Sequence, residues 1–245
     1  MTEALIPDWP APEHVKAMIT TRWGGYSQTP YDGMNLADHV GDDPGTVGKN
    51  RALLRQRFNL PAEPNWLQQV HGCQVTACDS GTVLVEADAV VAEQPGQVCA
   101  VMTADCLPLL ICNESGSRVA AVHAGWRGLA AGVIEAALDR FDESGESLLV
   151  WLGPAIGPDR FEVGDDVRQQ FLNSGQADES AFKPGAQGRW LADIYQLARI
   201  RLMKRNIGFV GGGDYCTVTE KKRFFSYRRD GSTGRMASLI WIDHR

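Results

Sequence analysis

Short apolar runs rich in β-branched residues alternate with polar, glycine-bearing turns along the chain, a pattern that predicts many short strands and few helices. Helices are predicted at 44–58, 129–141, 163–171 and 191–205. Strands are predicted at 15–21, 66–71, 74–77, 87–91, 98–103, 108–112, 118–123, 148–152, 207–211 and 235–241. Because several consecutive strands have no helix between them, this order favours an α+β fold with mixed sheets over a doubly wound parallel sheet.

Length and composition indicate one globular domain spanning residues 1–245, with 44% hydrophobic and 22% charged residues. Six cysteines dispersed through a chain of this size are expected to be reduced thiols, as in the cytosol. The N-terminus lacks the basic and apolar segments of a signal peptide, and Asp105 and Pro108 interrupt the longest apolar stretch, so no membrane helix is predicted. We therefore expect a soluble cytoplasmic protein, either a monomer or a small homo-oligomer.

The formal net charge of −6 opposes binding to nucleic acids and to anionic membranes, so any anionic ligand must be met by a local cationic cluster. The segment KKRFFSYRRD at 221–230 is cationic and aromatic, and we interpret it as a solvated surface with one or two contacts to a small anion. Arg22, in a glycine-bearing loop, Arg51, next to Asn50, and Arg127, next to Gly128, are further candidates for contact with an anion. A surface salt bridge is the commoner role for each of these arginines.

Residues 98–128 carry the strongest chemical pattern. Cys106 lies just past one apolar run and His123 closes the next, while His71 lies at another strand end or turn beside a glycine. A His, Cys, His set suits zinc, and three protein ligands leave the fourth position open, as in catalytic zinc sites. The wide spacing does not by itself distinguish such a site from a buried thiol and two hydrogen-bonded histidines.

A second interpretation makes Cys106 a nucleophile and His123 its base, with backbone amides near 124–128 forming an oxyanion hole. Asp105 is a candidate for orienting a histidine or for general acid–base catalysis, although a turn or capping role is commoner for an aspartate. The residues alone leave the metal site and the nucleophile both open.

Several long motifs resemble the YfiH-like family, also called the laccase-domain or polyphenol oxidase family. These motifs span nearly the whole chain and are WLQQVHG, VMTADCLPLLIC, VAAVHAGWRG, WLGPAIGP, LADIYQLAR and FFSYRRD. The resemblance implies an α+β fold in which mixed sheets pack together with helices outside. It also implies zinc ligands at His71, Cys106 and His123, and no ligand position departs from the family's pattern.

The resemblance implies several activities: a multicopper laccase, a purine nucleoside phosphorylase that also has adenosine deaminase and methylthioadenosine phosphorylase activity, and an editing factor for peptidoglycan precursors. Five histidines are too few for a blue-copper centre plus a three-copper cluster, although a single copper ion suits the same His, Cys, His donors. We therefore expect a zinc-dependent enzyme that binds a purine nucleoside and phosphate. Arg51, Arg127 or Arg228 is the expected phosphate contact, and Asp105 the expected group for proton transfer.

Two alternatives differ in class from this expectation. One is a hydrolase of amino-acyl or muropeptide-like precursors in which Cys106 is the nucleophile. The other is a zinc-storing protein, which would have a closed coordination shell. The zinc-deaminase signature (H-x-E with P-C-x-x-C) and a P-loop are both absent from the sequence, so deamination or phosphate binding would need another structural solution.

Overall fold

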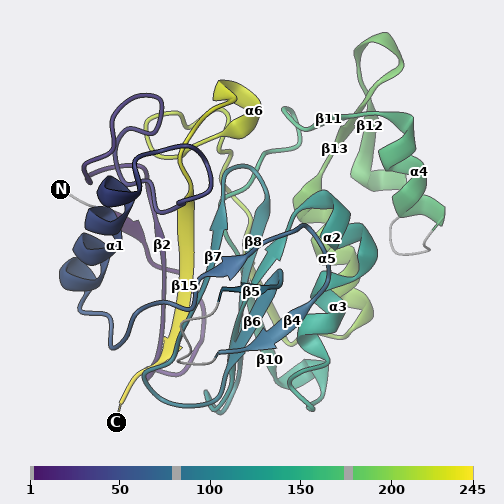
Figure 1. Cartoon of the computed structure of the whole chain (residues 1–245). Coiled ribbons are helices and arrows are strands. Elements are labelled where there is room, and N and C mark those ends of the chain that lie inside the picture. The colour runs from purple at the N-terminus through teal and green to yellow at the C-terminus, as the bar shows by residue number, and fades with distance from the viewer. Residues whose placement is uncertain (1–2, 79–83, 174–178, 245) are drawn as a thin grey trace.

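The computed structural model describes residues 3–78, 84–173 and 179–244, where two β-sheets pack face to face between outer helices (Figure 1). The first sheet is antiparallel, with the strand order β1 (Ala4–Leu5), β2 (Val15–Thr20), β15 (Met236–Ile242) and β7 (Val98–Thr103). The second sheet has the order β14 (Phe209–Gly212), β10 (Leu148–Leu152), β8 (Leu107–Asn113), β9 (Val119–Ala124), β6 (Ala89–Ala92) and β4 (Val75–Ala77). This sheet is mixed, because β10–β14 and β4–β6 are parallel pairs.

Five strands of the two sheets are buried on both faces. Every residue of β7, β8, β9, β10 and β15 is buried, which explains why their sequences are nearly continuous apolar runs. The two sheets contact each other through a core that includes Val101, Ala121 and Ile240. The other face of the six-stranded sheet packs on helices through residues such as Val122 and Leu197.

Helices cover both outer faces of this pair of sheets. Helix α1 (Pro44–Phe58) covers the four-stranded sheet and begins where predicted, because the Asp43 side chain caps it by accepting a 2.7 Å hydrogen bond from the Thr46 amide. On the opposite side lie α2 (Trp126–Ala131), α3 (Val133–Leu138) and α5 (Ile194–Lys204). The layered α+β fold with mixed sheets and outer helices is confirmed.

Three predicted helices differ from the structure in their bounds. The helix predicted at 129–141 is two helices, α2 and α3, separated at Gly132, whose φ of 101° breaks the helical path. Helices α4 (Asp165–Asn173) and α5 begin later than predicted, because the residues before them form strands. In a small third sheet, β13 (Trp190–Ala192) pairs with β11 (Glu162–Val163) on one side and with β12 (Phe182–Pro184) on the other.

The strand predicted at 66–71 is also shorter than expected. Only β3 (Leu67–Gln68) remains, paired with β5 (Val85–Glu86), because the chain turns at His71 with a φ of 61°. The strand predicted at 87–91 begins two residues later, as β6, which leaves Asp88 just outside it.

Among the described residues, no helix has the length and apolar character needed to cross a bilayer.

Candidate metal centre and its two cavities

Strand pairing brings Cys106 and His123 together. In the antiparallel β8–β9 ladder, Leu107 pairs with Ala124 and Pro108 pairs with His123. Continuing this register by one residue places Cys106 opposite Gly125, two residues after His123. His71 reaches the same place from the turn after β3, so three segments distant in sequence supply the three side chains that the sequence analysis singled out.

The geometry of the three side chains is compatible with a metal site. Their ligand atoms all lie within 4.8 Å of one another, and Cys106 Sγ is 3.7 Å from His71 Nε2. In a tetrahedral site with normal bond lengths, a sulfur and a nitrogen ligand lie about 3.5 Å apart. The ring centroids of His71 and His123 are 4.8 Å apart and nearly perpendicular. His71, Cys106 and His123 are therefore able to hold zinc, and the same donors also suit copper.

Asp88 is the buried anchor of this centre, and the sequence analysis did not identify it. Its carboxylate lies 2.7 Å from His123 Nδ1 and accepts hydrogen bonds from the backbone amides of His71 at 2.9 Å and Gly72 at 2.7 Å. In the other direction, the His123 amide donates to the Asp88 carbonyl at 2.7 Å. Because Nδ1 is held by Asp88, the Nε2 atom of His123 is left for the metal side, as is usual for a ligating histidine with a carboxylate partner.

The negative charge of Cys106 and the positive charge of His123 stabilise each other. Burial raises the pKa of the Cys106 thiol, but His123 and His71 outweigh this effect and bring that pKa to about 6. Burial lowers the pKa of His123, but Cys106 and Asp88 outweigh it and raise that pKa to about 9. The two histidines therefore favour the thiolate form of Cys106, which is the form that binds a metal and also the form that attacks an electrophile.

Two cavities meet at the triad. The first, of about 250 Å³, is largely apolar and is lined by Trp126, Ile156, Phe161 and Ile194, together with Asp105, Arg127 and Arg228. The second, of about 320 Å³, is more polar and is lined by His39, Thr103, His123 and Arg235, among others. His71, Ala104, Cys106 and Tyr227 line both cavities. The metal-capable atoms are thus accessible from two sides with different chemistry.

Asp105 and the three predicted phosphate contacts have different positions. Arg127 is exposed and stacks on Trp126, while Arg228 donates to the Glu162 carbonyl at 3.1 Å, and both line the apolar cavity. Arg51 lines neither cavity: it stacks on Trp66 and pairs with Asp38 at 3.4 Å. The carboxylate of Asp105 accepts 2.6 Å hydrogen bonds from the Thr217 hydroxyl and the Arg228 amide. Asp105 thereby positions the segment that carries Arg228, and its role in proton transfer stays a prediction.

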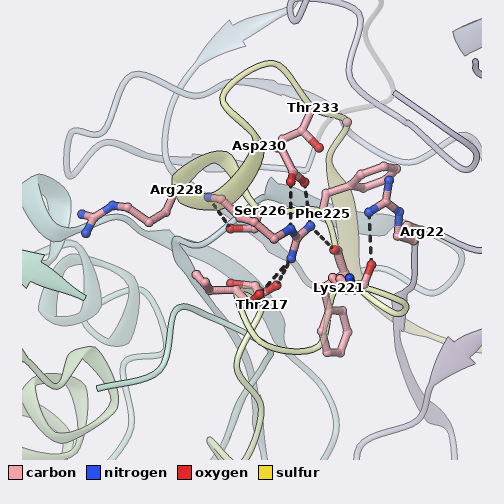
Figure 2. A network of polar contacts seen from close by, with 12 residues as sticks. Arg22, Thr217, Lys221, Phe225, Ser226, Arg228, Asp230 and Thr233 are labelled. Carbon is pink, nitrogen blue, oxygen red and sulfur yellow. Dashed lines mark hydrogen bonds and ion pairs between the residues drawn. The ribbon is translucent and has the colours of Figure 1, made fainter. Parts of the chain in front are cut away.

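Helix α6 (Tyr227–Asp230) is fixed by a network around Arg229 (Figure 2). The Arg229 guanidinium donates to the Thr217 carbonyl at 2.7 Å and pairs with Asp230. Figure 2 shows the Arg228 side chain pointing away from this network. A larger cavity, of about 760 Å³, lies beside the network, but its arginines, Arg22 and Arg229, are already paired with Asp32 and Asp230. The network thus holds Tyr227 and Arg228 over the metal centre.

Sequence reasoning missed Asp88, Tyr227 and Arg235. A faint signal exists for Asp88, since a single carboxylate directly precedes the wholly apolar strand AVVA. Tyr227 lies inside the segment at 221–230, of which only the cationic residues were considered as candidate contacts to an anion. For Arg235, burial lowers the pKa of the guanidinium, while the negative charges of Cys106 and Asp105 oppose that effect. Only the fold shows that Arg235 is close to the centre.

Gly125 is expected to be required for the spacing of the ligands. A Cβ at this position would lie 2.7 Å from His71 Cδ2 and 3.1 Å from Cys106 Sγ, so Gly125→Ala should push the two ligands apart. We expect at least a tenfold loss of zinc affinity, about the effect of disturbing an outer partner of a metal ligand. Competition with a chromogenic chelator measures this loss. Gly48→Ala, where a Cβ meets nothing within 4 Å, is the control. Unchanged affinity in Gly125→Ala would contradict the geometry.

Comparisons with known proteins agree with the resemblance noted in the sequence. A family model described as "Multi-copper polyphenol oxidoreductase laccase" matches residues 16–243. A Pseudomonas aeruginosa protein named purine nucleoside phosphorylase is 54% identical, with 99% of each chain covered. Escherichia coli YfiH, with the same name, is 51% identical over 99% of this chain and 100% of its own length. The crystal structure of Neisseria meningitidis NMB0706 superposes with a TM-score of 0.95 at 47% identity, covering 98% of this chain and 99% of that one.

Proposed function

The chain belongs to the multi-copper polyphenol oxidoreductase laccase family, and on that basis we propose that it is a zinc-dependent purine nucleoside enzyme. It cleaves adenosine, inosine or methylthioadenosine with phosphate, giving the free base and ribose 1-phosphate or methylthioribose 1-phosphate, and it also deaminates adenosine. The observation that carries the proposal is the His71, Cys106 and His123 set open to two cavities. Relatives named purine nucleoside phosphorylase, aligned over nearly their whole length, support it.

The apolar cavity suits the planar base and the sugar of a nucleoside. Trp126 and Phe161 supply aromatic surface, while Ile156 and Ile194 exclude water from around it. Arg127 and Arg228 place positive charge in the same cavity. When bound, the zinc ion supplies Lewis-acid polarisation between the two cavities.

The proposed phosphorolysis exchanges one bond for another at C1′ of the sugar. A phosphate oxygen forms a bond to C1′ while the glycosidic C–N bond breaks, and the electron pair of that bond leaves with the base. The departing base takes up the proton that the hydrogen phosphate ion gives up, and Asp105 in the apolar cavity is the proposed group for this proton transfer. In deamination, water replaces the amino group of adenosine, which leaves as ammonia.

A direct assay tests the proposal. Purified protein with quantified metal, incubated with inosine and phosphate, is expected to give hypoxanthine and ribose 1-phosphate in equal amounts. His71→Ala should reduce turnover at least about a hundredfold together with bound zinc, since it removes a metal ligand. His244→Ala, at an exposed position remote from the triad, is the matched control. Full activity in His71→Ala would overturn the proposal.

One observation favours a second candidate, a hydrolase acting on amino-acyl or muropeptide-like precursors. The Cys106 thiolate, His123 and Asp88 form a chain resembling a cysteine, its base and an orienting carboxylate. A metal-free protein that retains full activity, with a thioester trapped on Cys106, would favour this candidate. Elemental analysis of the same samples distinguishes zinc from copper. Copper bound to the same donors would point to phenol oxidation instead.

A further inference from the structure

The polar cavity beside the triad has hydrogen-bond donors that no protein group uses. It is lined by His39, Gln69, Thr103 and Arg235 in addition to the metal-capable side chains. Gln69 is not free for a ligand, because its side-chain amide bonds to both the amide and the carbonyl of Met102, at 2.7 and 2.8 Å. The donors that remain come chiefly from Arg235 and Thr103.

Arg235 is held in place without a carboxylate partner. Its Nη1 donates to the carbonyls of Thr233 at 2.9 Å and Gly234 at 3.1 Å, and its backbone amide donates to Asn35 Oδ1 at 3.0 Å. Within residues 3–78, 84–173 and 179–244, no Asp or Glu oxygen lies within ion-pair distance of its guanidinium, whereas Arg22, Arg51 and Arg229 all have such a partner. The other guanidinium nitrogens make no hydrogen bond to that part of the chain. A guanidinium group that is fixed through one nitrogen, with its other N–H donors free, is suited to bind an oxyanion.

Thr103 is a second and independent observation. It is the last residue of β7, the residue is 2% exposed, and its hydroxyl has no hydrogen-bond partner in the described part of the chain. A buried hydroxyl without a partner is costly, and most such groups in proteins are satisfied. Since Thr103 lines the same cavity as Arg235, an oxygen of a bound ligand would satisfy it.

We propose that Arg235 and Thr103 form an oxyanion subsite that binds the inorganic phosphate used in phosphorolysis. This assignment rests on the proposed function and replaces Arg51, Arg127 and Arg228 as the phosphate contact. It divides the site by chemistry: the uncharged nucleoside occupies the apolar cavity, the phosphate occupies the polar one, and the triad lies between them. His39 also lines this cavity, and its Nδ1 lies 3.5 Å from the Asp38 carboxylate.

Calorimetric titration of the metal-quantified protein with inorganic phosphate tests the subsite. Arg235→Gln should weaken binding at least about tenfold, because it removes charge-assisted hydrogen bonds. Arg235→Lys should show an intermediate loss, since lysine keeps the charge without the guanidinium group, and Thr103→Val should weaken binding several-fold. Arg199→Gln is the matched control, because Arg199 also donates to two main-chain carbonyls but lines neither cavity. Thr103→Val and Arg235→Lys keep the test decisive if Arg235→Gln fails to fold.

Two outcomes of the titration would overturn the subsite. One is unchanged phosphate affinity in the Arg235 and Thr103 variants, or an equal loss in Arg228→Gln. The other is Arg235-dependent binding of inosine monophosphate but not of inorganic phosphate, which would assign the subsite to a phosphate ester of the substrate.

Kinetic measurements distinguish a failure of the phosphate subsite from a failure of the proposed function. In the inosine assay, Arg235→Gln should raise the KM for phosphate at least about tenfold while the KM for inosine changes less than about twofold. If phosphate binds in an Arg235-dependent way but no ribose 1-phosphate forms, the proposed function fails and the oxyanion subsite stands. If ribose 1-phosphate forms and Arg235→Gln leaves the KM for phosphate unchanged, the subsite fails and the proposed function stands.

Discussion

Cys106→Ala is expected to remove tightly bound zinc and to abolish turnover. The thiolate is the one anionic donor of the triad and lies 3.7 Å from His71 Nε2, so its removal leaves two histidines that cannot hold the ion alone. The loss of zinc affinity should exceed the ~10–100-fold typical of losing only an outer partner of a ligand. Equilibrium competition with a chelator, and turnover measured on the same sample, give the two quantities.

Cys73→Ala is the control for this variant, because Cys73 lies two residues from His71 but is exposed and outside the triad. Zinc content and turnover should be normal in this variant. If Cys106→Ala retained stoichiometric zinc, or if Cys73→Ala lost it, the ligand set would be wrong. If Cys106→Ala lost zinc and kept full turnover, the metal would have no part in the reaction.

Asp88→Asn is expected to weaken both the fold and the metal centre. The buried carboxylate accepts hydrogen bonds from two backbone amides and holds His123 Nδ1, and an amide group cannot accept all of these. Stability should fall by about 3 kcal/mol, since bonds to a buried charged group are lost, and zinc affinity should fall ~10–100-fold. Urea unfolding of the metal-free protein and chelator competition measure the two effects separately.

The stability effect of Asp88→Asn should depend on pH. Burial raises the pKa of Asp88, but its hydrogen bonds and His123 outweigh burial and hold that pKa below the ordinary value of 3.8. A carboxyl whose pKa is lowered by folding stabilises the protein above its unfolded pKa, and this contribution is lost as the pH falls through the folded pKa. The stability difference from the unaltered protein should therefore be full at neutral pH and shrink below about pH 4.

Asp193→Asn provides the control for this second variant. Asp193 caps α5 by accepting a hydrogen bond from the Gln196 amide at 3.0 Å, and asparagine caps a helix as well as aspartate does. Little change in stability or zinc affinity is expected. A stability curve for Asp88→Asn parallel to that of the unaltered protein at every pH would contradict the anchoring role of Asp88.

Short sequence patterns were sufficient to predict the elements whose structure depends on interactions between residues close together in the chain. The Asp43–Pro44 pair starts α1 because a capping oxygen and a fixed φ act within one turn of helix. The apolar runs at β7, β8 and β9 are strands because a segment buried on both faces needs side chains that are apolar throughout. Local signals failed at 163 and at 191–192, which were predicted to be helical, because pairing between strands distant in the sequence outweighs the helical pattern there.

The same division applies to the candidate site. The sequence by itself predicted the donors His71, Cys106 and His123 through motifs that resemble those of a known family, and their geometry in the fold is compatible with a metal. Only the tertiary structure decided their neighbours. Asp88 meets His123 through the register between two strands, Arg235 enters from the start of β15, and Arg51 is directed to Asp38 instead of the cavities. Those contacts depend on how distant segments pack, and no pattern within one segment records that packing.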